Sequence, residues 1–450
     1  MRGFRRSTVR LGLAAATAGV LVGYGQVTGQ SPVAGNEVPK AGKNGEAEAD
    51  KPRDPSRSRP PAEPPLPPLE LSECLSVAAQ RRPAIRSAHH SLAAAERAAA
   101  ALNNLPALAE RLSPDLPVRR QQSARGVVVA TAEVQKVGHD TTHDVTYLYY
   151  SYVYARQQEQ TADDVIEQME IYYDVAEGIV RAGVRDPKMK RVDQFTLYDL
   201  RNLIGDVRQQ RVRAVTGRKL ALEALKQAMG VGDDMVFAPA TTELPLMLAG
   251  TVSREQVLAD ALARRPELIQ AAAGVDAFRL EVCAQGMIKY RPTAVTLATG
   301  SDLHARLVPT AERDGTYKPG GLAPEMPPSL AGKRDDRVAR ATELSRRQDA
   351  LYDETVTLIR LEAARAYLAW EAATQQVKEA KQKFETSRRL VDESRAAAIA
   401  RQDPDLLVQN EAKAGKAQKE YVDAVYEHIR ALAALERVTA GGVVAKFPSR

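Results

Sequence analysis

The sequence repeats itself once, with a long period. Residues 75–85 read LSVAAQRRPAI and residues 258–268 read LADALARRPEL, which places Pro83 and Pro266 183 positions apart (266 − 83). An Asp-Pro pair follows in each copy, and Pro187 and Pro404 are 217 positions apart (404 − 187). This period is too long for a solenoid repeat and predicts two related half-molecules packed side by side. Between these marks the second copy is longer by 34 residues (217 − 183).

Heptad patterns predict how the half-molecules pack. One row reads Ala363, Trp370, Val377, Phe384, Val391 and Ala398, and its companion reads Ala366, Ala373, Ala380, Ser387 and Ser394. The following segment carries Leu407, Ala414, Tyr421 and Leu435 on one row, and Ala417, Ala424, Ala431 and Val438 on the other. Small residues on one row of each seam allow two helix backbones to approach closely. The row that begins at Ala417 has a counterpart 217 positions earlier, which reads Leu200, Val207, Ala214 and Ala221. The pattern by which the helices pack is therefore duplicated.

Composition supports long helices rather than a wide globular core. Apolar residues make up 44%, charged residues 27% and aromatic residues 5% of the 450 positions, which suits helices that meet along narrow seams. Helices over about 125–182 and 336–400 would be roughly 85 to 100 Å long. The chain turns back at each Asp-Pro, and the returning helices run to Gly230 and Gly441. The predicted fold class is therefore mainly α, with two tandem repeats of long antiparallel coiled-coil helices.

The N-terminal part predicts export. Basic residues 1–10 precede an apolar run over 11–22, which is the layout of a signal peptide, and the run is short for a membrane-spanning helix. We expect a signal peptide over 1–30 and a Pro-rich disordered leader over 31–68. The first helical repeat then covers 69–232, a linker 233–250, the second repeat 251–442 and a tail 443–450. The expected location is the periplasm, the outer membrane or the exterior.

Each repeat opens with the same local pattern, a short helix, a proline joint and a longer helix. Ser72 and Glu73 head the first short helix, and Ser253 heads the second. Pro83 and Pro266 suit the first turn of the helix that follows.

The extra residues of the second copy fall in a strand and loop insertion over 291–335. Residues 293–299 alternate as a strand does, and Leu303 and Leu307 continue the pattern after Gly300. The later stretch 315–332 is rich in Pro and Gly and is weak as a strand, although Tyr317 within it suits a membrane interface. The first copy offers only a Pro-broken polar loop over 103–124. We expect at most one hairpin per chain.

Catalytic, cofactor and nucleic-acid chemistry is not indicated. Much of the net charge of +6 comes from basic residues in the first sixty positions. No Gly-rich phosphate loop, nucleophile elbow or paired-carboxylate context is present, so we expect no enzyme and no cofactor. His139 and His143 are four residues apart on a predicted helix. Without further ligands they are expected on a solvated face rather than at a metal.

Two further residue types are interpreted structurally. The tyrosines over 147–154 are expected in helix and subunit packing, since Tyr150 and Tyr367 are 217 positions apart (367 − 150). Cys74 and Cys283 occupy non-equivalent places in the two copies and do not form a disulfide framework.

The chain resembles the TolC family of outer membrane efflux proteins, and the resemblance covers about 69–442. It is carried by LSECL over 71–75 with PAI over 83–85 and Ala88, and by VSREQVL over 252–258 with PEL over 266–268 and Ala271. Gly183 before the first Asp-Pro, and DLLV over 405–408 before Ala412, are similar to the family's tip and returning helix.

The resemblance implies a protomer of a TolC-like α-helical tunnel that works as a homotrimer in the outer membrane. It implies a passive trans-periplasmic conduit for solutes delivered by an inner-membrane transporter and a periplasmic adaptor. The family has four membrane strands per subunit, whereas this chain has room for one hairpin. Either two strands per subunit make a reduced pore, or the tunnel meets the membrane in another way. The alternative is a non-conducting periplasmic helical scaffold or adaptor derived from such a channel.

Acidic residues near the second tip are the candidate site of the tunnel. In the family such residues constrict the periplasmic entrance, and Asp405 is the match by placement, with Asp403 beside it. Three copies of Asp405 around an axis would attract cations. Both carboxylates could equally cap the returning helix.

Overall fold

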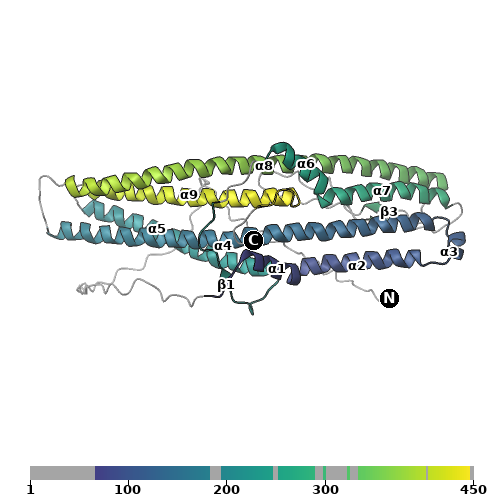
Figure 1. The fold of residues 1–450 in the computed structure, drawn as a ribbon, viewed down its shortest axis with the longest axis horizontal. Helices are drawn as coiled ribbons and strands as arrows, with labels where there is room; N and C mark the ends of the chain where they lie inside the picture. The colour runs from purple at the N-terminus through teal and green to yellow at the C-terminus, as the bar shows by residue number, and fades with distance from the viewer. Residues whose placement is uncertain are drawn as a thin grey trace, which may run out of the picture. The chain divides into compact units, whose positions relative to one another are not determined.

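The computed structural model describes residues 66–182, 194–246, 252–288, 297–299, 322–324, 333–401 and 404–445. The chain divides into units Met1–Glu63 and Pro64–Arg450, and all described residues belong to the second. Its elements, labelled in Figure 1, are β1 (Pro68–Leu69), α1 (Leu71–Arg81), α2 (Pro83–Asn103), α3 (Ala107–Leu112), α4 (Leu116–Ala182), α5 (Gln194–Met229), β2 (Ala238–Pro239), α6 (Arg254–Arg264), α7 (Pro266–Met287), β3 (Leu297–Thr299), β4 (Leu322–Pro324), α8 (Arg334–Arg401) and α9 (Pro404–Val438).

Two long helices, α4 with 67 residues and α8 with 68, organise the described residues. At 1.5 Å per residue each is about 100 Å long. The shorter helices α2 and α5 pack on α4, while α7 and α9 pack on α8 (Figure 1). Ion pairs show that α5 is antiparallel to α4, because Glu159, Asp163 and Glu170 pair with Arg218, Arg211 and Arg208 in that order. The predicted duplication and the mainly α fold class are confirmed.

The lengths of equivalent helices locate the extra residues of the second copy. The helices α2 and α7 have 21 and 22 residues, and α5 and α9 have 36 and 35. The connection from α2 to α4 covers 104–115, whereas the connection from α7 to α8 covers 288–333. The 34 residues therefore lie wholly in that second connection, as the sequence predicted.

The proline joints and the glycine stops form as predicted. Pro83 and Pro266 begin α2 and α7, where a missing backbone N–H costs nothing. The Ser253 hydroxyl caps α6 by accepting from the Gln256 N–H at 3.1 Å. Gly230 follows α5 with φ +70°, and a Cβ there would lie 2.7 Å from the Arg81 carbonyl oxygen. Only glycine satisfies both the backbone angle and this close approach.

The predicted seam is the core of the second helix pair. Ala363 and Ala417 have no exposed surface, and Ala373 is 5% exposed. Trp370 joins the same buried cluster as Tyr149 and Tyr150, both 0% exposed. Small residues thus stand at the close helix contacts and large ones fill the spaces beside them. The side chains of Ala398 and Leu407 lie outside the described part of the chain.

The predicted loop over 103–124 is wrong. The helix α3 occupies 107–112, and α4 begins at Leu116, nine residues before the expected start. Pro106 is the residue before α3 and Pro117 is the second residue of α4. Proline is tolerated at both places because first-turn N–H groups have no intrahelical partner. These prolines therefore start helices rather than interrupt them.

The described strands are short. Strands β3 and β4 pair antiparallel, with Leu297 opposite Pro324 and Thr299 opposite Leu322. This confirms one hairpin pairing, and β4 arises within the stretch that is weak as a strand. Leu303, Leu307 and Tyr317 lie outside the described residues. Strands β1 and β2 form a parallel pair of two residues each, which the sequence did not predict because so short a segment has no periodicity.

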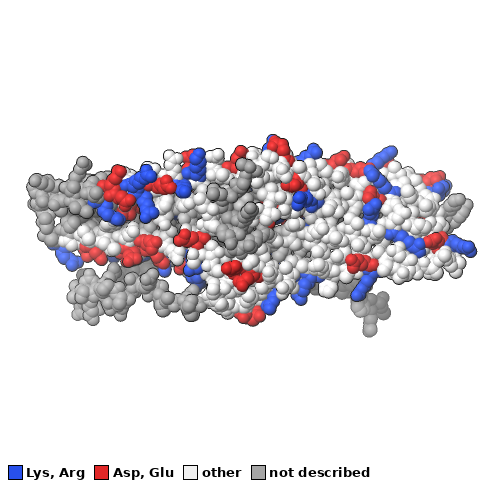
Figure 2. All heavy atoms as spheres, in the orientation of Figure 1, with Lys and Arg blue, Asp and Glu red and all other residues white. Residues whose placement is uncertain are grey.

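Acidic and basic side chains are interspersed over the face shown in Figure 2. Among the helices that the structure describes, we find none with a stretch both long enough and apolar enough to cross a bilayer.

Candidate functional site

Three polar clusters lie between the packed helices. The first is near the turn between α8 and α9, which is the tip of the second helix pair. Pro404 begins α9, so Asp405 stands in the first turn of that helix. The side chain of Asp405 and the whole of Asp403 lie outside the described part of the chain. Their role at a tunnel entrance stays a prediction.

Glu411, less than two turns beyond Asp405, ties three helices together. Its Oε1 accepts a hydrogen bond from Arg395 Nη2 of α8 at 2.9 Å and from the Tyr172 hydroxyl of α4 at 3.4 Å. Burial raises the pKa of Tyr172 and the charge on Glu411 raises it further, so the hydroxyl remains a donor. We name these three residues the tip cluster. Sequence reasoning missed it, because no local pattern shows which residue of α4 faces α9.

A belt of aromatic residues joins α4 to α9 further from the tip. The rings of Tyr154 and Tyr426 stack with their centroids 4.3 Å apart. The Tyr154 hydroxyl donates to Asp423 Oδ1 at 2.7 Å, and Ser151 and Tyr426 share a hydrogen bond of 2.6 Å. Burial raises the pKa of Asp423. The predicted role of these tyrosines in helix packing is confirmed within the protomer.

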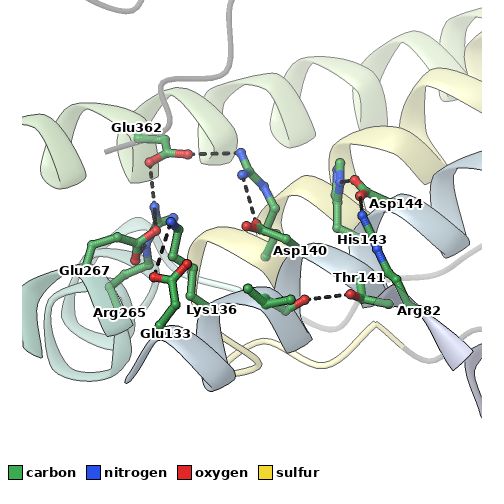
Figure 3. A network of polar contacts seen from close by, with 12 residues as sticks. Arg82, Glu133, Lys136, Asp140, Thr141, His143, Asp144, Arg265, Glu267 and Glu362 are labelled. Atoms are coloured by element: carbon green, nitrogen blue, oxygen red, sulfur yellow. Dashed lines mark hydrogen bonds and ion pairs between the residues drawn. The ribbon is translucent and has the colours of Figure 1, made fainter. Parts of the chain in front are cut away.

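The third cluster surrounds the joint between α6 and α7 (Figure 3). Arg265 is 3% exposed. It lies between Glu267, with bonds of 3.0 and 3.1 Å, and Glu362 of α8, with a bond of 3.0 Å. Arg437 of α9 continues the network to Glu362 at 3.1 Å and to Asp140 of α4 at 3.5 Å. A set of charges that is buried at Arg265 and Glu267 therefore connects four helices.

The equivalent joint of the first repeat is anchored in the same way. Arg82 Nη2 lies 2.7 Å from Asp144 Oδ2 of α4, and Figure 3 shows both joints together. Position 144 shifted by 217 falls one residue before Glu362. The last arginine of each Arg-Arg-Pro triplet thus fastens its proline joint to the long helix of the same repeat.

The histidine prediction needs correction. His139 and His143 are half-buried beside the first joint rather than on a solvated face, because α1 and α2 pack on α4 there. His143 Nδ1 lies 3.5 Å from Asp144, and burial lowers the pKa of His139. No group of three or more His, Cys, Asp or Glu with the geometry of a metal site occurs among the described residues. His139 also borders a shallow cavity of about 370 Å³ between α1, α2 and α4.

Both cysteines are free, Cys74 buried and Cys283 exposed. Burial raises the pKa of Cys74 to about 12, so its thiol stays protonated.

No family model matches the sequence, and no curated protein matches it. Solved structures do match. The outer-membrane channel OprN superposes with a TM-score of 0.64 over 82% of this chain and 90% of that one, at 16% identity. The open state of the MtrE outer membrane channel of Neisseria gonorrhoeae gives 0.62 over 84% and 90%, also at 16% identity. This is the fold of the TolC-like outer membrane channels.

A third channel of this fold agrees over nearly its whole length. The outer membrane protein VceC of Vibrio cholerae gives a TM-score of 0.60 over 83% of this chain and 97% of that one, at 12% identity. At such identities the likeness concerns the fold. In this TolC-like fold each of the three clusters lies where separate helices meet and joins helices that are distant in the sequence.

Proposed function

We propose that this chain is the protomer of an outer membrane efflux channel, a passive trans-periplasmic conduit for solutes delivered by an inner-membrane pump and a periplasmic adaptor. The observation that carries the proposal is the pair of duplicated helices, each about 100 Å long, in a fold that known outer membrane channels share over more than four fifths of this chain. A globular periplasmic protein has no need of such length.

Exposed apolar side chains support a homotrimer. Ile171 on α4, Val212 on α5 and Leu368 on α8 are 57%, 63% and 55% exposed, although they stand on helices whose opposite faces are already packed. In the trimer that we propose, neighbouring subunits would cover such side chains. The signal peptide over 1–30, the leader over 31–68, the repeats over 69–232 and 251–442 and the outer membrane location belong to the same proposal.

The tips of the helix pairs would form the gate. The tip cluster fastens α4 to α8 and α9 through partly exposed hydrogen bonds, which are weak enough to break when one pair moves against the other. Asp405, with Asp403 beside it in the sequence, is our candidate for the entrance, where three copies of Asp405 around the axis of the trimer would attract cations.

Conductance tests the proposal. Purified full-length protein should insert into planar bilayers and pass ions, and Asp405→Ala should weaken block by divalent or organic cations from the tip side. Glu371→Ala is the matched control, because Glu371 is an exposed carboxylate near the middle of α8, far from the turn and from the tip cluster. A trimer that stays soluble and never conducts would instead support the non-conducting scaffold. If block by cations is unchanged in Asp405→Ala, Asp405 does not line the entrance.

A further inference from the structure

The turn between α2 and α4 exposes three leucines. Leu105, Leu108 and Leu112 are 40%, 63% and 67% exposed, and we call them the α3 leucine patch. Leu108 and Leu112 are four residues apart and share one face of α3. Directly after them Leu116 and Val118 are each 5% exposed. The head of α4 therefore packs well, and the exposure belongs to the turn over 105–112.

The turn that carries the patch is held in shape from behind. Arg120 Nε donates to the Leu102 carbonyl at 2.9 Å and Nη2 to the Leu105 carbonyl at 3.1 Å. The same guanidinium pairs with Glu110 of α3. These bonds fix α3 against the head of α4, so its leucines point outward from a preorganised turn.

Further contacts place this turn at the same end of the helices as the insertion of the second repeat. The Gln122 side-chain amide of α4 donates to the Ala277 carbonyl of α7 at 3.0 Å, and Arg119 pairs with Glu281. Arg337 of α8 donates to the Ile288 carbonyl, the last described residue before the insertion, at 2.7 Å. The connections 104–115 and 288–333 thus leave the helices together.

We propose that the α3 leucine patch inserts into the interface of a lipid bilayer and replaces, in the first repeat, the hairpin that the chain lacks. This rests on the proposed function, which brings the insertion at this end to the outer membrane. Segment 103–114 carries two charged residues: Arg111 is exposed, and Glu110, with 43% of its side chain exposed, is neutralised by its ion pair with Arg120. A cation beside apolar side chains fits the phosphate and acyl boundary of a bilayer. A protein partner would have to present both an apolar surface and an acidic group at this end of the helices, whereas the bilayer that the proposed function brings here offers both.

Site-directed fluorescence in proteoliposomes tests the patch directly. Cys283→Ser removes the exposed thiol and Cys74 is buried, so Leu108→Cys in that background carries a single environment-sensitive label. Val444→Cys is the matched control, since Val444 is 62% exposed and lies just after α9. The vesicles contain phosphatidylethanolamine and phosphatidylglycerol. Two quenchers are used in separate experiments: a nitroxide attached to the lipid, and iodide dissolved in the aqueous phase.

The label at 108 should be quenched by the lipid-borne nitroxide and shielded from iodide, whereas the label at 444 should respond to iodide. Quenching at 108 by iodide alone, or by neither agent, would overturn the proposal, because the patch would then face water or protein. Replacing all three leucines by serine should lower the number of channels inserted per protein by roughly tenfold without changing the conductance of each. Unchanged insertion would also overturn it.

The test separates this inference from the proposed function. A chain that never conducts but whose label at 108 is quenched by lipid refutes the conduit and keeps the patch. A chain that conducts but whose label at 108 is quenched by iodide alone supports the conduit and refutes the insertion of the patch.

Discussion

Removal of Arg265 should be among the most damaging single changes in the described part of the molecule. Arg265→Met keeps most of the apolar stem but deletes a guanidinium that bonds to Glu267 at 3.0 and 3.1 Å and to Glu362 at 3.0 Å. With Arg265 only 3% exposed, water cannot replace it. Two carboxylates would then be buried with one partner fewer, which costs about 3–5 kcal/mol of unfolding free energy.

Arg264→Met is the matched control for this change. It alters the same residue type one position earlier, but the Arg264 side chain is 55% exposed and makes a single contact of 3.7 Å with Asp260. A long ion pair of this kind, whose arginine is open to solvent, contributes less than about 1 kcal/mol. Denaturant unfolding of both variants, followed by the loss of helical circular dichroism, measures the difference. Equal losses in the two variants would refute the argument from the buried network.

The pH dependence of the Arg265→Met deficit gives a second check. Burial raises the pKa of Glu362, and the charge of Arg265 opposes that rise. Without Arg265 the folded-state pKa of Glu362 therefore moves further above its unfolded value. Such a carboxyl favours folding in acid, and its contribution is lost as pH rises through the folded pKa. The deficit should accordingly shrink from neutral pH towards about pH 5, and a deficit that grows in acid would contradict this.

Three further changes test other parts of the structure. Ala373→Trp should overpack the seam and lower the unfolding free energy by about 1–3 kcal/mol, whereas Ala372→Trp on the exposed side should not; equal denaturant midpoints would argue against the seam. Burial lowers the pKa of His428, so the unfolded chain takes up the proton first and stability falls as pH drops below about 6.5. His428→Gln should reduce that acid sensitivity in denaturant titrations, and His90→Gln, at an exposed position, should leave it unchanged. If the two variants have identical pH profiles, the buried His428 is not the source of the acid sensitivity. Glu411→Gln should weaken the tip cluster and raise the fraction of time for which the channel is open in single-channel recordings. If that fraction is unchanged, the tip cluster takes no part in gating.

Much of the fold could be predicted because its signals are local. A heptad row, a proline in a first turn and a glycine after a helix each act through neighbours within a few residues, so Pro266, Ala373 and Gly230 can be interpreted from sequence alone. The same locality explains the error at Pro106 and Pro117. A proline indicates a helix boundary without showing on which side the helix lies.

The polar clusters could not be predicted, because their partners come from separate helices. Nothing near Arg265 in sequence indicates that Glu362, 97 positions later, would share its buried network. The internal repeat did carry one usable signal. Arg82 and Arg265 are equivalent, so a carboxylate found opposite one predicts a carboxylate about 217 positions later opposite the other, and Asp144 and Glu362 fit that rule within one residue.

The duplication constrains the two ends of the helices differently. Along the wall, equivalent helices differ by a single residue, since α4 and α8 have 67 and 68 residues and α2 and α7 have 21 and 22. A wall built from both repeats requires this match, because a shorter helix in one repeat would leave the seam of its neighbour unpacked. The end that bears α3 is under no such requirement. There one repeat has 34 residues more than the other, and the shorter connection exposes leucines instead of burying them. A missing hairpin that was merely lost should leave a polar turn, so three outward leucines on a turn fixed by Arg120 favour a replacement contact with the bilayer over a simple deletion.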